Sequence, residues 1–401
     1  MTTVSWLVPT LIEGSGGHRT ILQNAEFLQS NHYDTTIYLE NDSSLRARES
    51  ASDCIFRLFG YRFANVRIGW HEIKPCDMVF ATIWYSAKIV RDLNFACKKL
   101  YFVQDWEACF NPMGDTYLLA ENSYRYGLTP ITIGNWLRHE IYSRFNTNSF
   151  SFDFCADTSI YRPLANVRKE LAICFICQPE KPRRGAFLGI EALGIVKHLM
   201  PEVKIYLYGS KTPMHVWFEH ENLGLINLEE CNALYNRCMV GFCISSSNPS
   251  RIPFEMMAAG LPIIELYRTN TRYDLPNEAS ILCDQAPESF AEGLIYLLKN
   301  AQLREEMSRS ANLFMANKPL AWGMKQVLEA VKWVDANPAG LYPPTLPTKP
   351  LYSQPPMSAA HFVKMLPKNF SAKNKTFLTR HKKKNFLHHV VAKTKNMMGI
   401  A

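Results

Sequence analysis

The sequence predicts an α/β protein made of two Rossmann-like halves, followed by a C-terminal tail of different composition. Three observations support this fold class. Strand-like and helix-like segments alternate along residues 1–335, which is typical of parallel sheets connected by helices. A glycine-rich turn, "EGSGGHR", follows the first strand-like segment and precedes a helix-like one. Residues 336–401 contain 11 Lys or Arg and neither Asp nor Glu, so the folded body is expected to end near residue 335.

Residues 1–165 are expected to form the first domain. "VSWLVP" is an apolar run that predicts the first strand, and "TILQNAEFL" places Ile21, Ala25 and Leu28 on one face of a helix. Further strands are expected at "DTTIYLE", "DMVFAT", "KLYFVQ" and "PITIG", and helices at "AENSYRYG" and "NWLRHEIYSRF".

Residues 166–318 repeat the alternation and are expected to form the second domain. Strands are expected at "LAICFICQ", "VKIYLYGS" and "MVGFCISS", and a helix at "GAFLGIEALGIVKHLM". The helix "NLEECNALYNRC" opens with Asn227 and Glu230, which have the spacing of a capping box. Two more helices are expected near 287–300 and 301–317, and "AWGMKQVLEAVKWV" predicts a closing helix within residues 319–335.

The stretch "SRIPFEMMAAGLPIIE", residues 250–265, predicts a short buried helix followed by a buried strand. Pro253 suits the first turn of a helix, and Gly260 suits a left-handed cap at its end. Glu255 lies in the first turn of this apolar helix, where a carboxylate is costly unless something binds it. Two interpretations remain open: Glu255 caps its own helix, or it holds a hydroxyl group of a ligand.

The composition indicates the broad class of protein to which the chain belongs. A hydrophobic content of 47% and a charged content of 20% are ordinary for a globular protein, and no apolar run is long enough to span a bilayer. The N-terminus lacks the basic region of a signal peptide. The 11 cysteines are scattered, and Cys174 and Cys177 form a CxxC without a second ligand pair. Reduced core cysteines in the cytoplasm are therefore expected, rather than a zinc or redox site.

The net charge of +8 belongs to the tail, because the first 335 residues carry 33 basic and 36 acidic side chains. Nucleic acid is therefore not an expected partner. The tail begins with a proline-rich stretch that predicts extended or disordered chain. Its later part mixes basic and apolar residues. Two interpretations of this part remain open: it contacts an anionic membrane surface, or it is a solvated tail. The residues concerned are Lys382, Lys383, Lys384, Phe377, Phe386 and Leu387.

The glycine-rich turn is the first candidate binding site. Gly16 and Gly17 would let the backbone approach a phosphate at a helix N-terminus. A dinucleotide fingerprint would need a glycine at position 19, which is Arg19. Glu40, at the end of the second strand, favours a dinucleotide. His18 and Arg19 are either phosphate contacts or solvated residues of the first turn.

Two such halves resemble a glycosyltransferase of the GT-B fold, more closely one of family 4, and within it the rhamnosyltransferases of bacterial surface glycans. The similar stretches are "GGHRTIL", "YFVQDWEACFNPMGDTYLLAENSYRYG", "PRRGAFLGIEAL" and "IPFEMMAAGLPII". The resemblance covers residues 1–335 and implies two domains facing across a cleft, the first on the acceptor side and the second binding the nucleotide. It implies dTDP-L-rhamnose as donor, a glycan acceptor that is free or lipid-linked, retention of configuration, and no metal ion or other cofactor.

The resemblance also implies donor-binding residues. Glu255 matches the second glutamate of the family's Glu-x7-Glu motif and is expected to contact the donor ribose, whereas Ser247 stands in place of the first glutamate. Other expected donor contacts are Gly16, Gly17, His18, Arg19, Gly209 and Ser250.

Two further positions differ from the family pattern. Gln178 lies near the place of an arginine that binds the diphosphate, and Arg183 and Arg184 are the nearest cations. Leu225 stands where a further basic residue is often found. Together with Ser247, these differences suggest an alternative: a non-catalytic protein that binds sugar nucleotides or glycans through a degraded GT-B site.

The acceptor side is expected at the end of the strand "KLYFVQ", because α/β sheets bind ligands at the carboxyl ends of their strands. Asp105 and Glu107 are the predicted catalytic residues, with Gln104 and Trp106 beside them. In an inverting enzyme Asp105 would be the general base. In a retaining enzyme it would only orient the acceptor hydroxyl. Alternatively, both acids cap helices or lie on the surface.

The sequence thus predicts a cytoplasmic glycosyltransferase, with possible peripheral contact at the inner face of the membrane, that extends a surface polysaccharide. A transferase for mannose, glucose or an amino sugar is an alternative of the same fold. A dinucleotide-dependent oxidoreductase is disfavoured by Arg19.

Overall fold

The computed structural model describes residues 1–212, 214–341 and 348–358 of the 401-residue chain. The basic and apolar cluster around Lys382, Lys383 and Lys384 lies outside the described residues. Among the helices of the described part, none is long and apolar enough to span a membrane.

The first half contains a seven-stranded sheet in the order β3-β2-β1-β4-β5-β6-β7, with every neighbouring pair parallel. The strand order reverses between β1 and β4, which makes a switch point of the kind where such sheets bind ligands. The strands are β1 (Thr3–Val8), β2 (Asp34–Leu39), β3 (Asn65–Ile68), β4 (Met78–Ala81), β5 (Lys98–Val103), β6 (Thr129–Ile133) and β7 (Phe150–Phe152). The helices are α1 (Gly16–Ser30), α2 (Ala51–Phe59), α3 (Trp84–Arg91), α4 (Asp115–Asn122) and α5 (Gly134–Phe145), with 3₁₀ turns η1 (Glu107–Phe110) and η2 (Ser123–Arg125).

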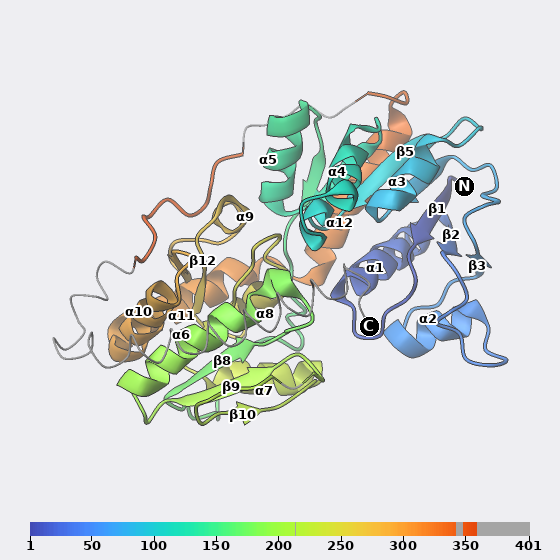
Figure 1. Ribbon diagram of the computed structural model, residues 1–401. Helices are drawn as coiled ribbons and strands as arrows, with labels where there is room; N and C mark the ends of the chain where they lie inside the picture. The colour runs from blue at the N-terminus through green and yellow to red at the C-terminus, as the bar shows by residue number, and fades with distance from the viewer. Residues whose placement is uncertain (213, 342–347, 359–401) are drawn as a thin grey trace, which may run out of the picture. The chain divides into compact units, whose positions relative to one another are not determined.

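The second half contains a six-stranded parallel sheet in the order β10-β9-β8-β11-β12-β13. Its strands are β8 (Ala172–Ile176), β9 (Lys204–Tyr208), β10 (Glu221–Asn222), β11 (Val240–Phe242), β12 (Ile263–Leu266) and β13 (Ser280–Cys283). Its helices are α6 (Ala186–Leu199), α7 (Leu228–Arg237), α8 (Ile252–Ala258), α9 (Thr269–Arg272), α10 (Pro287–Lys299) and α11 (Ala301–Ala316), with a 3₁₀ turn η3 (Pro182–Arg184). The predicted fold class, two α/β halves built on parallel sheets, is confirmed (Figure 1).

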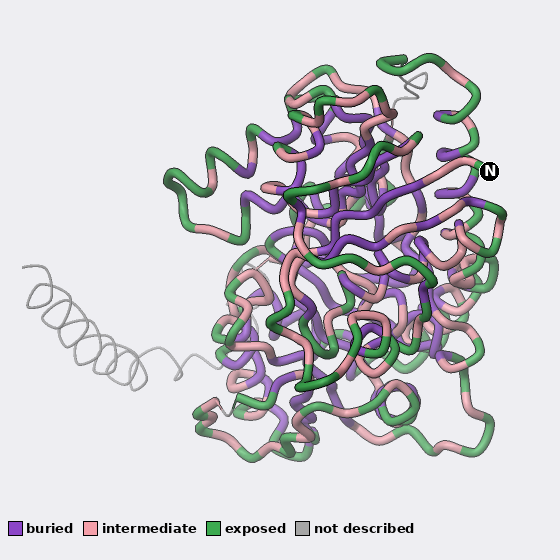
Figure 2. The backbone as a smooth tube through the Cα atoms, turned by 90° about the vertical axis from the view of Figure 1, so that its right-hand side faces the viewer, coloured by how far each residue is buried: buried purple, intermediate pink, exposed green. Residues whose placement is uncertain are grey.

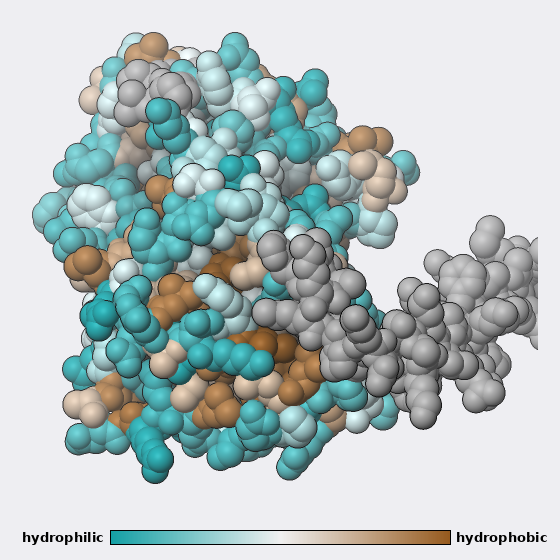
Figure 3. Space-filling view, turned by 90° about the vertical axis from the view of Figure 1, so that its left-hand side faces the viewer, coloured by the Kyte–Doolittle hydropathy of each residue, from teal (hydrophilic) through white to brown (hydrophobic). Residues whose placement is uncertain are grey.

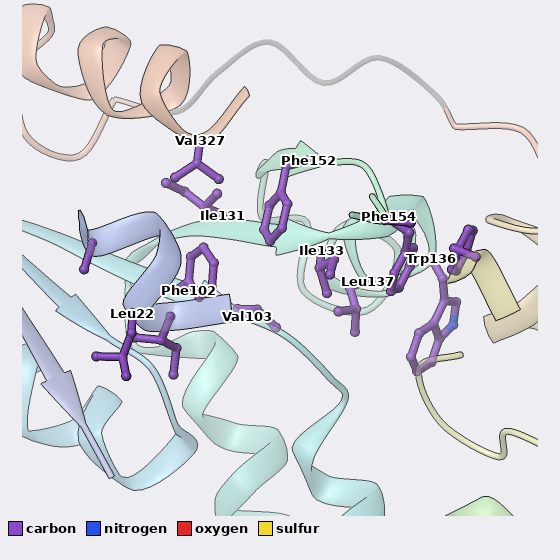
Figure 4. Packing of buried hydrophobic residues seen from close by; sticks show 14 of the residues in the cluster. Leu22, Phe102, Val103, Ile131, Ile133, Trp136, Leu137, Phe152, Phe154 and Val327 are labelled. Atoms are coloured by element: carbon purple, nitrogen blue, oxygen red, sulfur yellow. The ribbon is translucent and has the colours of Figure 1, made fainter. Parts of the chain in front are cut away.

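The central strands of both sheets are almost continuous runs of apolar residues and are buried, which is typical of parallel sheets covered on both faces. Figure 2 shows buried positions concentrated in the interior of the backbone trace and exposed ones along its outside. In the first half, Trp6 of β1 stacks on Phe80 of β4 with 3.9 Å between ring centroids. Phe102 and Phe152 stack at 5.3 Å, and Figure 4 shows both beside other buried side chains of β6 and α5. On the face shown in Figure 3, hydrophilic side chains surround scattered apolar ones, an ordinary protein surface.

The closing helix α12 (Leu320–Ala336) follows the second half in sequence but packs on the first sheet, against β7 and α1 (Figure 1). Trp322 donates its indole N–H to Asp153 at 2.8 Å, and Trp333 meets Phe150 edge-on at 5.3 Å. The Nζ of Lys98 donates to the carbonyl of Val334 near the end of the helix. The chain therefore returns to its first half before the predicted tail begins.

Part of the predicted tail contacts the second sheet. Tyr352 is buried, and its hydroxyl accepts a hydrogen bond from the backbone N–H of Leu282 in β13 at 3.2 Å. The backbone N–H of Met357 donates to the carbonyl of Leu282 at 2.9 Å, and Met357 pairs with Cys283 in a parallel bridge. The proline-rich composition predicts an extended chain here but not this pairing along β13.

Candidate functional site

Most of the predicted site residues lie at the carboxyl ends of the two sheets. The loop that follows β11 meets the residues that follow β5, so that side chains from both halves come into contact. We call residues 245–250, "SSSNPS", the serine loop.

Asp105 is the centre of this contact and is 7% exposed. Its Oδ1 accepts hydrogen bonds from the backbone N–H groups of Trp106, at 2.8 Å, and Asn248, at 2.9 Å. Its Oδ2 accepts a hydrogen bond from the hydroxyl of Ser247 at 3.1 Å. The side-chain amide of Asn248 donates to the carbonyl of Gln104 at 2.6 Å. The predicted acceptor-side acid is therefore bound to the serine loop of the other half.

Arg183 and Arg184, the cations predicted to bind the diphosphate, lie on the other side of the serine loop in η3. The guanidinium of Arg184 donates to the hydroxyl of Ser245 at 2.9 Å and to the carbonyl of Asn248 at 2.8 Å. The Nε of Arg183 lies 3.7 Å from Oδ2 of Asp105, and its guanidinium stacks on the ring of Phe110. Burial raises the pKa of Asp105, whereas Arg184 and Arg183 act to lower it.

Glu265 of β12 and Asn270 of α9 bond to the serine loop, and the sequence analysis did not select either. Glu265 is fully buried in β12, and its Oε1 accepts the backbone N–H of Ser245 at 2.8 Å. Burial raises the pKa of Glu265 to about 7. The side-chain amide of Asn270 donates to the carbonyls of Ser245 and Ser247. An acid at the end of an otherwise apolar strand, "PIIE", is the signal that points to Glu265.

Glu107 makes different contacts from Asp105. Its carboxylate accepts hydrogen bonds from the backbone N–H of Trp84, at 2.5 Å, and from the hydroxyl of Tyr101, at 3.3 Å. Trp84 begins α3, so the contact is that of a helix-capping acid, as in the alternative interpretation of this residue. Burial raises the pKa of Glu107 to about 8. Trp106 is also buried and stacks on Tyr124 at 4.5 Å.

The glycine-rich turn lies beside the same region. Ser15 caps α1 by accepting the backbone N–H of His18, so Gly16 and Gly17 form the first turn of the helix. A Cβ at Gly17 would lie 3.8 Å from the side chain of Gln104. The ring of His18 is buried against Ser15 and the carbonyl of Pro9, and burial lowers its pKa. The side chain of His18 therefore contacts other residues of the loop that precedes α1.

Glu255 lies in the first turn of α8, as predicted, with Pro253 at the start of the helix and Gly260 at a φ of +74° after its end. Among the described residues, the N-cap residue of α8, Arg251, makes no side-chain capping hydrogen bond, and the hydroxyl of Ser250 accepts the backbone N–H of Ile252 at the start of the helix at 3.4 Å.

Glu255 has polar neighbours from both halves. The hydroxyl of Tyr161 bonds to its carboxylate, and Arg251 and Arg19 lie close enough to act on its charge. Burial raises the pKa of Glu255 to about 6, against the effect of Arg251. Arg251 also donates to the side-chain oxygen of Gln23 in α1 at 3.3 Å. Arg251, Tyr161 and Gln23 were not selected from the sequence.

Gln178 and Gly209 lie together at the ends of β8 and β9. The side-chain amide of Gln178 donates to the carbonyl of Gly209 at 2.9 Å. Gly209 has a φ of +98°, and a Cβ there would lie 2.9 Å from the side chain of Ile176. Ser250, in the serine loop, has a φ of +68°, which is uncommon for a residue with a side chain. Leu225 is 58% exposed.

The comparisons with known proteins agree with this geometry. Residues 171–295 match the family described as "WsaF, C-terminal domain". A relative from Myxococcus xanthus, described as "O-antigen biosynthesis protein RfbC", is 26% identical over 350 residues, which is 84% of this chain. The chain spans 27% of that relative's length.

Solved structures share the fold across most of the chain. Sucrose-phosphate synthase from Thermosynechococcus elongatus has a TM-score of 0.67 at 14% identity, covering 84% of this chain and 100% of that one. HepE from Anabaena, solved with UDP and glucose, has a TM-score of 0.63 at 11% identity, covering 83% and 100%. A TarM variant from S. aureus, solved with fondaparinux, α-GlcNAc-glycerol and UDP, has a TM-score of 0.64 at 10% identity, covering 83% and 99%. The predicted resemblance to GT-B glycosyltransferases is therefore confirmed: the chain has the GT-B fold, and residues 171–295 of its second half match the C-terminal domain of WsaF.

Proposed function

We propose that the protein is a glycosyltransferase that moves a sugar from a nucleotide-sugar donor to a glycan acceptor in surface-polysaccharide biosynthesis. The described role of the Myxococcus relative in O-antigen biosynthesis supports the process, and the UDP and glucose in the HepE structure support the class of donor. The observation that carries the proposal is the partly buried carboxylate of Glu255, beside Arg251 and Tyr161. A perturbed acid with charged partners at the ligand-binding edge of a parallel sheet is typical of a functional site.

In this proposal the nucleotide lies on the second half, and Glu255 accepts hydrogen bonds from the ribose hydroxyls. With a pKa of about 6, Glu255 is mostly ionised at neutral pH, and an ionised acceptor makes the stronger hydrogen bond. The diphosphate lies at the N-terminus of α1, where backbone N–H groups and the helix dipole favour an anion. The other proposed donor contacts are Gly16, Gly17, His18, Arg19, Gln178, Arg183, Arg184, Gly209 and Ser250.

The proposed donor is dTDP-L-rhamnose, and the proposed outcome is retention, both following from the resemblance to family 4 rhamnosyltransferases. The bond between the sugar C1 and the diphosphate oxygen breaks, the acceptor oxygen bonds to C1, and the acceptor proton passes to the departing diphosphate. Cationic side chains and the N-terminus of α1 stabilise the charge that develops on that group. Gln104, Asp105, Trp106 and Glu107 lie on the acceptor side. The proposed reaction uses no metal ion, so a chelator should leave turnover unchanged.

The test is a thermal-shift screen of nucleotide sugars, followed by product detection with the donors that bind, because a ligand raises apparent stability by mass action. Stabilisation by dTDP-L-rhamnose and glycan product with it would support the full proposal. Turnover with another hexose donor would change the proposed donor sugar but would support the proposed glycosyltransferase activity. Binding without turnover would favour the non-catalytic alternative, which the neutral residues Ser247 and Leu225 suggest.

We also propose that the reaction takes place on the cytoplasmic face of the membrane, near a lipid-linked acceptor, with the basic tail bound to anionic lipid. Each basic residue near an anionic surface contributes about 1 kcal/mol. The test compares co-sedimentation of the full chain with anionic and neutral vesicles, before and after replacing Lys382, Lys383 and Lys384 by Gln. Equal sedimentation in all cases would contradict the membrane contact.

A further inference from the structure

Asp105 already accepts three hydrogen bonds from donors of the protein itself. One oxygen accepts two backbone N–H groups, those of Trp106 and Asn248, and the other accepts the hydroxyl of Ser247. Arg183 approaches that second oxygen to 3.7 Å. A general base must instead reach the proton of the substrate hydroxyl with a free acceptor position. Because Asp105 is 7% exposed and Ser247 is fully buried, little room remains around this carboxylate for a substrate.

The partners of Asp105 in the second half belong to one short segment that leads into α8. Ser247 and Asn248 lie in the serine loop, and residue 252 begins α8, which carries Glu255. Arg184 bonds to the same loop through Ser245 and Asn248. A displacement of the loop from Asp105 would therefore shift both the start of α8 and the guanidinium of Arg184.

The pair also restricts which side chains fit at position 247. The site faces a carboxylate at 3.1 Å and is closed to solvent. An acid at position 247 would place two like charges in contact, which is strongly unfavourable where water is excluded. A small neutral donor such as Ser247 satisfies Asp105 without that repulsion.

We propose that Asp105 is a positioning residue: it tethers the serine loop of the second half to the first half and so holds Glu255 and Arg184 in place for the donor. Ser247 is the matching donor of this tether. This inference rests on the proposed function for its link to donor binding, but the tether itself can be tested in the protein without any ligand.

The first experiment is a double-mutant cycle on urea unfolding of the full chain, with Asp105→Ala, Ser247→Ala and the combination. A tether predicts that the two substitutions are coupled by roughly tenfold in the unfolding equilibrium constant, the usual range for directly bonded side chains. The matched control pairs Asp105→Ala with Ser52→Ala, because Ser52 of α2 also donates its hydroxyl, but to the backbone carbonyl of Phe63 and not to Asp105. The control pair should be additive. Additive effects at Asp105 and Ser247 would overturn the tether.

The second experiment exchanges the pair, as Asp105→Ser with Ser247→Asp, and measures donor binding and turnover. Each single change should weaken binding of dTDP-L-rhamnose at least tenfold, and the exchange should recover most of that loss, because it restores an acid opposite a hydroxyl. Normal donor binding in Asp105→Ser, with turnover lost and not recovered by the exchange, would make Asp105 a catalytic residue and overturn the proposal. If the wild-type protein binds no nucleotide sugar, the proposed function fails, while the unfolding cycle still decides the tether.

Discussion

Two buried aspartates join the halves of the molecule in opposite directions. Asp105 of the first half accepts hydrogen bonds from Ser247 and Asn248 of the second. Asp274 of the second half accepts backbone N–H groups from Asn135, at 2.6 Å, and Trp136, at 3.2 Å, in the first. Those two residues are in the first turn of α5, whose N-cap residue Ile133 makes no side-chain capping bond, so Asp274 caps this helix.

The two contacts differ in how the negative charge is balanced. The guanidinium groups of Arg184 and Arg183 act on Asp105. Asp274 is balanced mainly by two backbone N–H groups, with a smaller effect from Lys318, and burial raises its pKa to about 7. The positive charges of two arginines therefore stabilise the carboxylate of Asp105. The carboxylate of Asp274 is stabilised instead by hydrogen bonds from the first turn of α5, in a closely packed site. The Asp274 contact should therefore respond to pH and to packing, and the Asp105 contact to the loss of its donors.

The largest expected effect is on the pH dependence of stability. The pKa of Asp274 rises from an ordinary 3.8 to about 7 in the folded protein, so the folded state binds the proton more tightly than the unfolded state. The stabilisation is complete below pH 3.8 and is lost as the pH rises through 7. Asp274→Asn should remove this fall, which is at most about 4 kcal/mol. Urea unfolding from pH 4 to pH 8 measures it, and an identical slope in the variant would contradict the assignment.

The second effect tests packing at the same contact. Gly134 has a φ of +76°, and a Cβ there would lie 2.5 Å from the ring of Phe154 and 2.8 Å from an oxygen of Asp274. Gly134→Ala should lower the free energy of unfolding by about 3 kcal/mol through backbone strain and overlap. Gly127→Ala is the control for the backbone term alone, because Gly127 has a φ of +77° and nothing within 4 Å of such a Cβ. Equal losses in the two variants would show that the contact with Asp274 adds nothing.

These contacts mark the limit of what the sequence predicts. The helix from Pro253 to Gly260 and the capping box of Asn227 and Glu230 were predicted because each depends on residues a few positions apart, and both are confirmed. The bond between Ser247 and Asp105 joins residues 142 positions apart, and only the folded chain brings them together.

Three short strands at sheet edges that the sequence analysis missed have a common physical reason. The strand β3 is largely exposed at the edge of the first sheet, β10 has two exposed residues, and β7 has three residues. Without a buried face, an edge strand lacks the apolar run by which the central strands were recognised. The contact between Tyr352 and β13 was missed for a different reason. The prolines around Tyr352 favour an extended chain, but they do not indicate which strand that chain contacts.

The third prediction concerns Glu255, which lies beyond the serine loop and is not part of either contact. Glu255→Gln keeps the shape and removes the charge, so donor binding should weaken by about 1.5–3 kcal/mol, as for a charge-assisted hydrogen bond. The melting temperature without ligand should change little, because α8 loses only a dipole interaction of about 0.3–1 kcal/mol. Titration with the best-binding nucleotide sugar, beside a melt of each apo protein, measures both. Unchanged affinity with a lower melting temperature would indicate a capping role instead.

The smallest expected effect separates the two arginines at the Asp105 contact. The Nε of Arg183 lies 3.7 Å from Asp105, and the side chain is 24% exposed, so solvent weakens the ion pair and Arg183→Gln should cost only about 0.5 kcal/mol of stability. Arg184 instead donates two hydrogen bonds to the serine loop, and Arg184→Gln should cost about 2 kcal/mol because it leaves buried acceptors unpaired. The same variants also test donor binding. If Arg183 faces the diphosphate, as proposed, Arg183→Gln weakens donor binding by more than it weakens folding, and the loss shrinks at high salt. A variant that binds donor as tightly as wild type would confine Arg183 to its contacts with Asp105 and Phe110.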